Sequence, residues 1–167
     1  MSTIDLDALR KTRAENPGKI AEVLANRKRR ELLRGDGKLF IVAADHPARG
    51  ALGVGKNETA MADRNVLLER LALALSRPGV DGVLGTPDII EDLALLGLLD
   101  DKIVVGSMNR GGLKGASFEM DDRYTAYDVD GIVESGLDFG KNLVRINLKD
   151  AGSVDTLEAT ALAVSDA

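Results

Sequence analysis

Apolar residues follow two alternating patterns along this chain, short continuous runs and longer stretches at helical spacing. Continuous apolar runs predict strands that are buried on both faces of a parallel sheet. Apolar residues that recur every three or four positions predict helices. The expected strands are residues 39–44, 80–85, 103–106 and 143–148, and the expected helices beside them are 58–76, 87–99, 123–135 and 157–167. A leading helical segment, residues 1–34, comes first and is broken at Asn16 and Pro17.

Strands that alternate with helices predict an α/β fold with a parallel sheet. Two architectures fit, an open doubly wound sheet and part of a (β/α)8 TIM barrel. Four βα units occupy residues 38–167, about half of the ~250 residues of a complete barrel. The last expected helix runs to Ala167 without a glycine stop. We therefore expect residues 35–167 to be the N-terminal half of a truncated barrel, with a four-stranded open sheet as the alternative.

The composition argues against several classes of function. The net charge is −5 and only 3% of the residues are aromatic, whereas nucleic-acid binders show a basic excess or aromatic stacking platforms. The chain has no cysteine and a single histidine, His46, so neither a disulfide nor a zinc site of the usual kind is expected. No apolar run approaches the ~20 residues that span a bilayer, and the N-terminus lacks a signal core. We expect a cytoplasmic protein that binds neither nucleic acid nor membranes.

One basic run departs from this acidic balance. Arg27, Lys28, Arg29 and Arg30 follow one another inside the leading helical segment. Because acidic residues lie nearby in that segment, we interpret the run as a solvated helix face.

Candidate chemistry gathers where the expected strands end, which is where ligands bind in α/β folds. The first strand leads into Asp45 and His46, with Arg49 just beyond. A carboxylate beside an imidazole and a guanidinium suits proton transfer and the binding of phosphate or hydroxyl groups. Asn109 and Arg110 follow the third strand and can bind a substrate hydroxyl and an anion. Thr86, after the second strand, is expected only to cap a helix.

The fourth expected strand alternates apolar and polar residues. Arg145, Asn147 and Lys149 share one face at a period of two. In a barrel that face looks into the interior, where long polar side chains need partners or a ligand. A lysine there can serve Schiff-base or general-base chemistry. The alternative is an exposed edge strand of an open sheet.

A glycine-rich segment offers a competing function. Residues 50–57 match the spacing of a phosphate-binding P-loop up to Lys56, but Asn57 replaces the Ser or Thr that would hold magnesium. A mobile lid over a barrel mouth explains the same residues, and a nucleotide-binding module stays open as an alternative.

Four segments together resemble the class I aldolase superfamily of (β/α)8 barrels. They read FIVAADHPARG from residue 40, VDGVLGTPDIIEDL from 80, KIVVGSMNRGGL from 102 and LVRINLKD from 143. The resemblance is strongest to a bacterial branch found with inositol catabolism and labelled deoxyribose-phosphate-aldolase-like. The chain is also similar to tagatose-bisphosphate and archaeal-type fructose-bisphosphate aldolases. The resemblance covers residues 35–167 and implies metal-independent cleavage of a carbon–carbon bond in a phosphorylated sugar or inositol-derived intermediate, without a cofactor.

The resemblance also implies roles for individual residues. Asp45 matches a carboxylate that assists proton transfer, Arg145 matches a basic residue that contacts substrate, and Lys149 stands at the strand end as a proton-transfer partner. The superfamily's Schiff-base lysine lies on a sixth strand, which is expected outside this chain. The expected catalytic residues are Asp45 and Lys149, and the expected substrate-binding residues are His46, Arg49, Asn109, Arg110, Arg145 and Asn147.

The incomplete barrel has consequences for assembly. Unpaired strand edges are unfavourable, so the fragment alone is expected to be inactive and of low stability. Two halves can close a barrel by pairing, which predicts a homo-oligomer. A non-catalytic half-barrel that self-associates is a third alternative.

Overall fold

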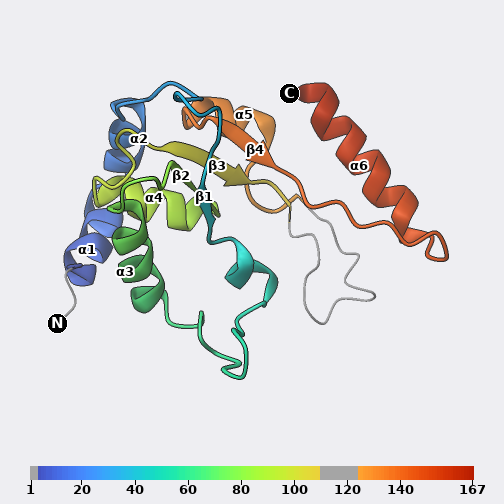
Figure 1. Cartoon of the computed structure of the whole chain (residues 1–167), viewed down its shortest axis with the longest axis horizontal. Helices are drawn as coiled ribbons and strands as arrows, with labels where there is room; N and C mark the ends of the chain where they lie inside the picture. The colour runs from blue at the N-terminus through green and yellow to red at the C-terminus, as the bar shows by residue number, and fades with distance from the viewer. Residues whose placement is uncertain (1–3, 110–123) are drawn as a thin grey trace.

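The computed structural model describes residues 4–109 and 124–167 (Figure 1). Within these residues, four parallel strands form one sheet in the order β1-β2-β3-β4. The strands are β1 (Ile41–Ala43), β2 (Gly82–Gly85), β3 (Ile103–Ser107) and β4 (Phe139–Lys141). The helices are α1 (Leu6–Glu15), α2 (Gly18–Ala25), α3 (Arg64–Leu75), α4 (Pro87–Leu95), α5 (Val129–Glu134) and α6 (Gly152–Asp166), with a short 3-10 helix, η1 (His46–Arg49), after β1. The expected α/β fold with a parallel sheet is confirmed.

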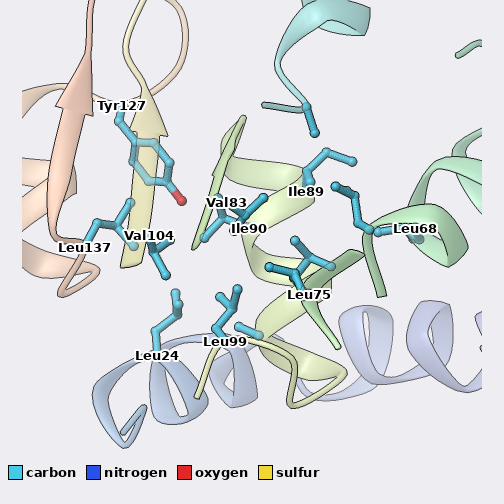
Figure 2. Packing of buried hydrophobic residues seen from close by; sticks show 14 of the residues in the cluster. Leu24, Leu68, Leu75, Val83, Ile89, Ile90, Leu99, Val104, Tyr127 and Leu137 are labelled. Atoms are coloured by element: carbon cyan, nitrogen blue, oxygen red, sulfur yellow. The ribbon is translucent and has the colours of Figure 1, made fainter. Parts of the chain in front are cut away.

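One face of the sheet is covered by helices. Helix α4 packs on β2 and β3, α5 packs on β4, and α2 and α3 pack on α4. Val83 and Val104 point into this layer and are fully buried with Leu68 and Ile90 (Figure 2). Burying one such side chain contributes about 1.5–3 kcal/mol. This aliphatic core fixes how the four strand ends are placed relative to one another.

The opposite face of the sheet is also aliphatic but only partly covered by the described residues. The strand register aligns Ala43, Leu84, Val105 and Phe139 in one row across the sheet. Because side chains alternate between faces along a strand, this row points away from Val83 and the helices. Ala43 is exposed, and Phe139 keeps 41% of its surface exposed. On this face, the next residue along each strand lies at the carboxyl edge of the sheet. The candidate site is at this edge.

Helix α6 follows β4 after an extended segment and lies to one side of the sheet (Figure 1), with Ala163 packed against the hydrophobic core. Ser153 fixes its start, since the Ser153 hydroxyl donates to the carbonyl of Asn147 and accepts from the Asn147 amide, each at 2.7 Å. Several large apolar side chains of α6 are exposed, namely Val154, Leu157, Leu162 and Val164. None of the described helices, α6 included, is both long and apolar enough to cross a membrane.

The fourth strand was predicted in the wrong place. It covers Phe139–Lys141, whereas residues 143–148 form the extended segment beyond the carboxyl edge of the sheet. The short strand was missed because its central residue is a glycine rather than an aliphatic residue. A Cβ at Gly140 would lie 2.5 Å from the Met108 sulfur, so the Met108 side chain would have to shift to admit a larger residue there. The alternation at 143–148 resembles a strand, but Leu148 is almost fully exposed.

Several helix boundaries also differ from the prediction. Helix α3 begins at Arg64 rather than at residue 58, because the Asp63 carboxylate caps it by accepting from the amides of Asn65 and Val66. Helix α5 begins at Val129, after the cap by Asp128, and α6 begins at Gly152, five residues before the expected start. The carboxylate caps decide where α3 and α5 begin, whereas the N-cap of α6, Ala151, makes no side-chain capping hydrogen bond.

The basic run is not a solvated helix face. The leading helices end at Ala25, and the side chains of Arg27 and Arg30 are 3% and 2% exposed. Arg27 donates to the carbonyls of Lys102 and Gly136 and to Asp138. Arg30 donates to Asp81 at 2.6 Å. Arg27 and Arg30 therefore hold the amino ends of the strands together, because their guanidinium groups donate to carbonyl and carboxylate groups at those ends.

Candidate functional site at the carboxyl edge of the sheet

Four polar side chains form a layer at the carboxyl edge, one from the end of each strand. Ser107 and Lys141 are partners in the register of β3 and β4. Asp45 and Thr86 each stand two positions beyond residues of the aliphatic row, so alternation places them on the same face. Asp45, Thr86 and Ser107 are buried. The sheet thus ends in a polar layer directly above its aliphatic row.

An ion pair joins the two edges of this layer. The Lys141 Nζ donates to Asp45 Oδ2 at 2.6 Å, and the two side chains are 24% and 8% exposed. Strands are about 4.8 Å apart, so three steps across a flat sheet separate β1 from β4 by roughly 14 Å. Side chains as short as these meet only if the sheet curves and its carboxyl ends converge. His46 also faces the carboxylate, with Nδ1 at 3.6 Å from Asp45 Oδ1.

Three members of the layer, Asp45, Thr86 and Ser107, line a cavity of about 250 Å³. The lining residues are Asp45, Ala48, Arg49, Thr86, Pro87, Asp88, Ser107, Asn109, Thr125 and Ala126. This volume is slightly below the common range of ligand pockets, and it suits a small metabolite. Most of the lining side chains can bind hydroxyl or anionic groups.

The acidic group at the rim of the cavity is neutralised by its neighbours. Asp88 accepts from the Thr86 hydroxyl and pairs with the Arg64 guanidinium. Burial opposes the charged form, but the hydrogen bond from Thr86 and the charge of Arg64 outweigh it and hold the pKa of Asp88 below its ordinary value. Arg64 also pairs with the buried Asp92. By contrast, the half-buried Arg49 has no acidic partner among residues 4–109 and 124–167. It is therefore the charged group best suited to bind an anion.

The side chain of Asn109 is hydrogen-bonded to the backbone of the segment that follows β4. Its side-chain amide donates to the carbonyl of Leu143 and accepts from the Leu143 amide, both at 2.9 Å. It is 4% exposed and lines the cavity. A role in binding substrate, as expected from the sequence, remains a prediction for this residue.

The structure brings together some of the predicted site residues and separates others. Asp45, Arg49 and Asn109 line the cavity, and His46 lies beside Asp45. Arg110 lies outside the described residues. Arg145 is half-buried, and Asn147 and Lys149 are exposed in the segment between β4 and α6. These three residues are not part of the described cavity lining, and the side-chain oxygen of Asn147 accepts from the backbone amide of Lys149.

Sequence reasoning missed Lys141 and Ser107 and gave Thr86 only a capping role. Lys141 was missed because the strand that carries it lacks an apolar run. Ser107 begins the predicted end of the third strand, but only Asn109 and Arg110 were given roles there. Thr86 does stand at the helix N-cap, yet its side chain makes no capping hydrogen bond and turns to Asp88 instead. A usable signal was the spacing itself, since each of these residues lies two positions beyond an apolar residue on the same face.

Two other kinds of site find little support. In the part of the chain that the structure describes, no group of His, Asp and Glu is arranged to hold a metal ion. The P-loop-like segment forms a turn closed by a bridge between Val54 and Asn57. Helix α3 begins only at Arg64, whereas a phosphate cradle needs the helix N-terminus directly after the glycine-rich loop. Lys56 is therefore not placed as in a nucleotide site.

The fold and the cavity define an α/β protein with a polar site at the carboxyl ends of four parallel strands. The chain belongs to the Cgl0159-like family, whose model matches residues 37–167. It is similar to the crystal structure of Cgl0159 from Corynebacterium glutamicum (Brevibacterium flavum), a structural genomics target, with 71% sequence identity and a TM-score of 0.93. That match covers 98% of this chain and 57% of the other, so the chain spans little more than half of its relative. No curated protein matches the chain.

The resemblance to the class I aldolase superfamily is corrected by these matches. Both the family model and the solved structure assign the chain to the Cgl0159-like family. A four-stranded parallel sheet does not by itself indicate an aldolase barrel. The first three of the segments that carried the resemblance each contain a strand and its carboxyl end, and the fourth follows β4; polar strand ends are shared by many α/β folds. They identify a place in the fold rather than a family.

Proposed function

We propose that the full-length protein is a metal-independent lyase of the aldolase type. Its substrate would be a phosphorylated sugar or an inositol-derived carbonyl compound. The proposal rests on Asp45, which lines the cavity and is ion-paired with Lys141 beside it, and not on membership of an aldolase family. A carboxylate and an ammonium held together beside a small polar cavity can move protons at a reacting carbon.

The same proposal includes the finer architecture, in which the sheet is half of a (β/α)8 barrel. Two features support it. The face away from the helices carries an aliphatic row, like the layers that fill a barrel interior. The pairing of Asp45 with Lys141 requires the curvature that closes a barrel. In this architecture the polar layer lies at the end of the barrel where active sites are found.

The chemistry begins with an imine. A lysine amine attacks the substrate carbonyl, a C–N bond forms and water leaves. The ammonium of Lys141 lacks the lone pair that this attack needs while it donates to Asp45, so we assign the imine to another lysine of the full-length protein. The β-hydroxyl then gives its proton to Asp45, the carbon–carbon bond breaks, and the electron pair moves to the iminium nitrogen. An aldehyde leaves, the resulting enamine recovers the proton at carbon, and water releases the second carbonyl product.

The remaining residues of the cavity serve binding. Arg49 can hold the phosphate, because it is half-buried in the cavity wall and lacks an acidic partner among the described residues. Lys141 holds Asp45 in position and balances its charge. Self-association, the other expectation from the sequence, remains a prediction that the size of the full-length protein in solution would test.

Borohydride trapping of the full-length protein with dihydroxyacetone phosphate tests the proposal. We expect a stable covalent adduct on a lysine, detected by mass spectrometry. We also expect protons on the hydroxymethyl carbon of the probe to exchange with solvent deuterium. Asp45→Asn and Lys141→Met should keep the adduct but slow this exchange by about 100-fold or more, the contribution of a positioned acid or base.

Lys149→Met is the matched control, because Lys149 is exposed and outside the described cavity lining. This variant should trap and exchange like the parent protein. The absence of any adduct, or full exchange in both Asp45→Asn and Lys141→Met, would contradict the proposed function.

A further inference from the structure

Ser107 is a buried hydroxyl whose hydrogen-bonding capacity is unused by the described residues. It is 3% exposed and lines the cavity. Its side chain makes no hydrogen bond to any residue within 4–109 and 124–167. Because Ser107 lines the cavity and its hydroxyl is not engaged by the described residues, this hydroxyl is available to a ligand bound in the cavity.

The neighbouring polar groups are already engaged. Thr86 donates to Asp88, the amide of Asn109 is paired with the backbone of Leu143, and Asp45 accepts from Lys141. Among the described members of the polar layer, Ser107 is thus the hydroxyl left to meet a ligand.

The position of Ser107 relative to the ion pair indicates which part of a ligand it meets. Ser107 and Lys141 are partners in register on one face of the sheet, and such neighbours are about 4.8 Å apart. A group bound by Ser107 therefore lies one or two carbons from a group bound by Lys141 or Asp45. A serine hydroxyl donates one hydrogen bond and accepts others, and a ligand hydroxyl matches both capacities, whereas a carbonyl oxygen only accepts.

We propose that Ser107 binds the hydroxyl on the carbon next to the reacting carbonyl and so determines specificity for α-hydroxy carbonyl substrates. This inference rests on the proposed function, which places proton transfer at Asp45, held in position by Lys141. A deoxy analogue would offer Ser107 no hydroxyl to bind, and so bind more weakly. Sites that hydrogen-bond a substrate hydroxyl discriminate strongly against analogues that lack it. We expect a preference of roughly 10-fold to 100-fold for the hydroxylated compound.

A matched pair of probes tests this inference in the full-length protein. Dihydroxyacetone phosphate and hydroxyacetone phosphate both carry a ketone and a phosphate, and they differ only in the hydroxyl beside the ketone. The half-saturating concentration for borohydride trapping is measured for each. The parent protein should favour dihydroxyacetone phosphate by roughly 10-fold or more. Ser107→Ala should weaken trapping of that probe, leave hydroxyacetone phosphate nearly unchanged, and bring the ratio close to one.

Ser107→Thr keeps the hydroxyl and should keep the preference, and thermal unfolding of both variants verifies that they fold. An unchanged preference in a folded Ser107→Ala protein would overturn the role of Ser107, while trapping itself would leave the proposed function standing. Equal trapping of both probes by the parent protein would overturn it in the same way. If neither probe forms an adduct with the parent protein, the proposed function fails, and the specificity of Ser107 fails with it.

Discussion

The Lys141 ammonium lies 2.6 Å from the Asp45 carboxylate, although 96 residues separate them in the chain. One residue follows the first strand and the other ends the fourth, so the pair connects the two edges of the described sheet. Among the described residues, no other ion pair or hydrogen bond joins the ends of these two strands. The same contact that we propose for proton transfer therefore also holds the carboxyl edge in its curved shape.

Removing the lysine should destabilise the protein. Lys141→Met leaves the buried Asp45 without its partner, and breaking a buried pair costs up to 3–5 kcal/mol. Because the Lys141 side chain is 24% exposed, we expect about 1–3 kcal/mol. Asp45→Asn combined with Lys141→Met should recover part of the loss. Urea unfolding of the full-length protein measures these values, and a change within about 0.5 kcal/mol is expected for the exposed control Lys149→Met.

A second buried carboxylate connects three helices. Asp92 of α4 is 2% exposed in its side chain and pairs with Arg13 of α1 and Arg64 of α3. Asp92→Asn should cost about 3–5 kcal/mol, because two guanidinium groups lose their shared partner. The neighbouring Glu91→Gln is the control, since Glu91 is more exposed and contacts only Arg13 among the described ion pairs. We expect a cost below about 1 kcal/mol there. Equal unfolding midpoints for the two variants would refute this account.

Arg27 should not be replaceable by lysine. Its guanidinium reaches the carbonyls of Lys102 and Gly136, at 2.8 and 2.9 Å, and the carboxylate of Asp138 at 3.1 Å. A lysine ammonium cannot reproduce this fork, so buried carbonyls lose their donors. Arg27→Lys should lower the free energy of unfolding by about 1–3 kcal/mol. Arg29→Lys, at an exposed position that also contacts Asp138, should change it by less than about 1 kcal/mol.

The sequence predicts the order of strands and helices well, because continuous apolar runs and helical periodicity are local signals. It also predicts that chemistry gathers at strand ends, since that follows from the parallel sheet. Which residues reach the site depends on the register of the strands. Strand register is not predicted by any local sequence pattern. A strand placed at residues 143–148 instead of 139–141 moved the expected lysine from Lys141 to Lys149. That shift was enough to replace a half-buried, paired side chain with an exposed one.

The basic run illustrates a second limit. Arg27 and Arg30 look like solvated residues because charged residues are rarely buried without partners. Their partners are carbonyls and carboxylates at distant positions, such as Gly136 and Asp81. Only the folded chain brings these groups together, so a run of four basic residues cannot by itself be assigned to the surface.

Acid should weaken the ion pair between Arg30 of the basic run and Asp81. The Arg30 guanidinium, and after it the backbone amide of Phe40, hold the pKa of Asp81 below its ordinary value. A carboxyl group whose pKa is depressed in the folded state stabilises the protein above its unfolded pKa. That stabilisation is lost as the pH falls through the folded pKa, which places the loss at about pH 4 and below.

Asp81→Asn removes this titration, so its free energy of unfolding should differ from that of the parent protein near neutral pH. The difference should shrink as the pH is lowered from about 6 to 2.5, because the protonated parent carboxyl and the amide then resemble each other. Urea unfolding at a series of pH values measures it. Arg30→Met removes the main cause of the shift and should flatten the same part of the curve. Curves of the parent and Asp81→Asn proteins that stay parallel to pH 2.5 would show that Arg30 contributes to the attachment through packing rather than through the charge on Asp81.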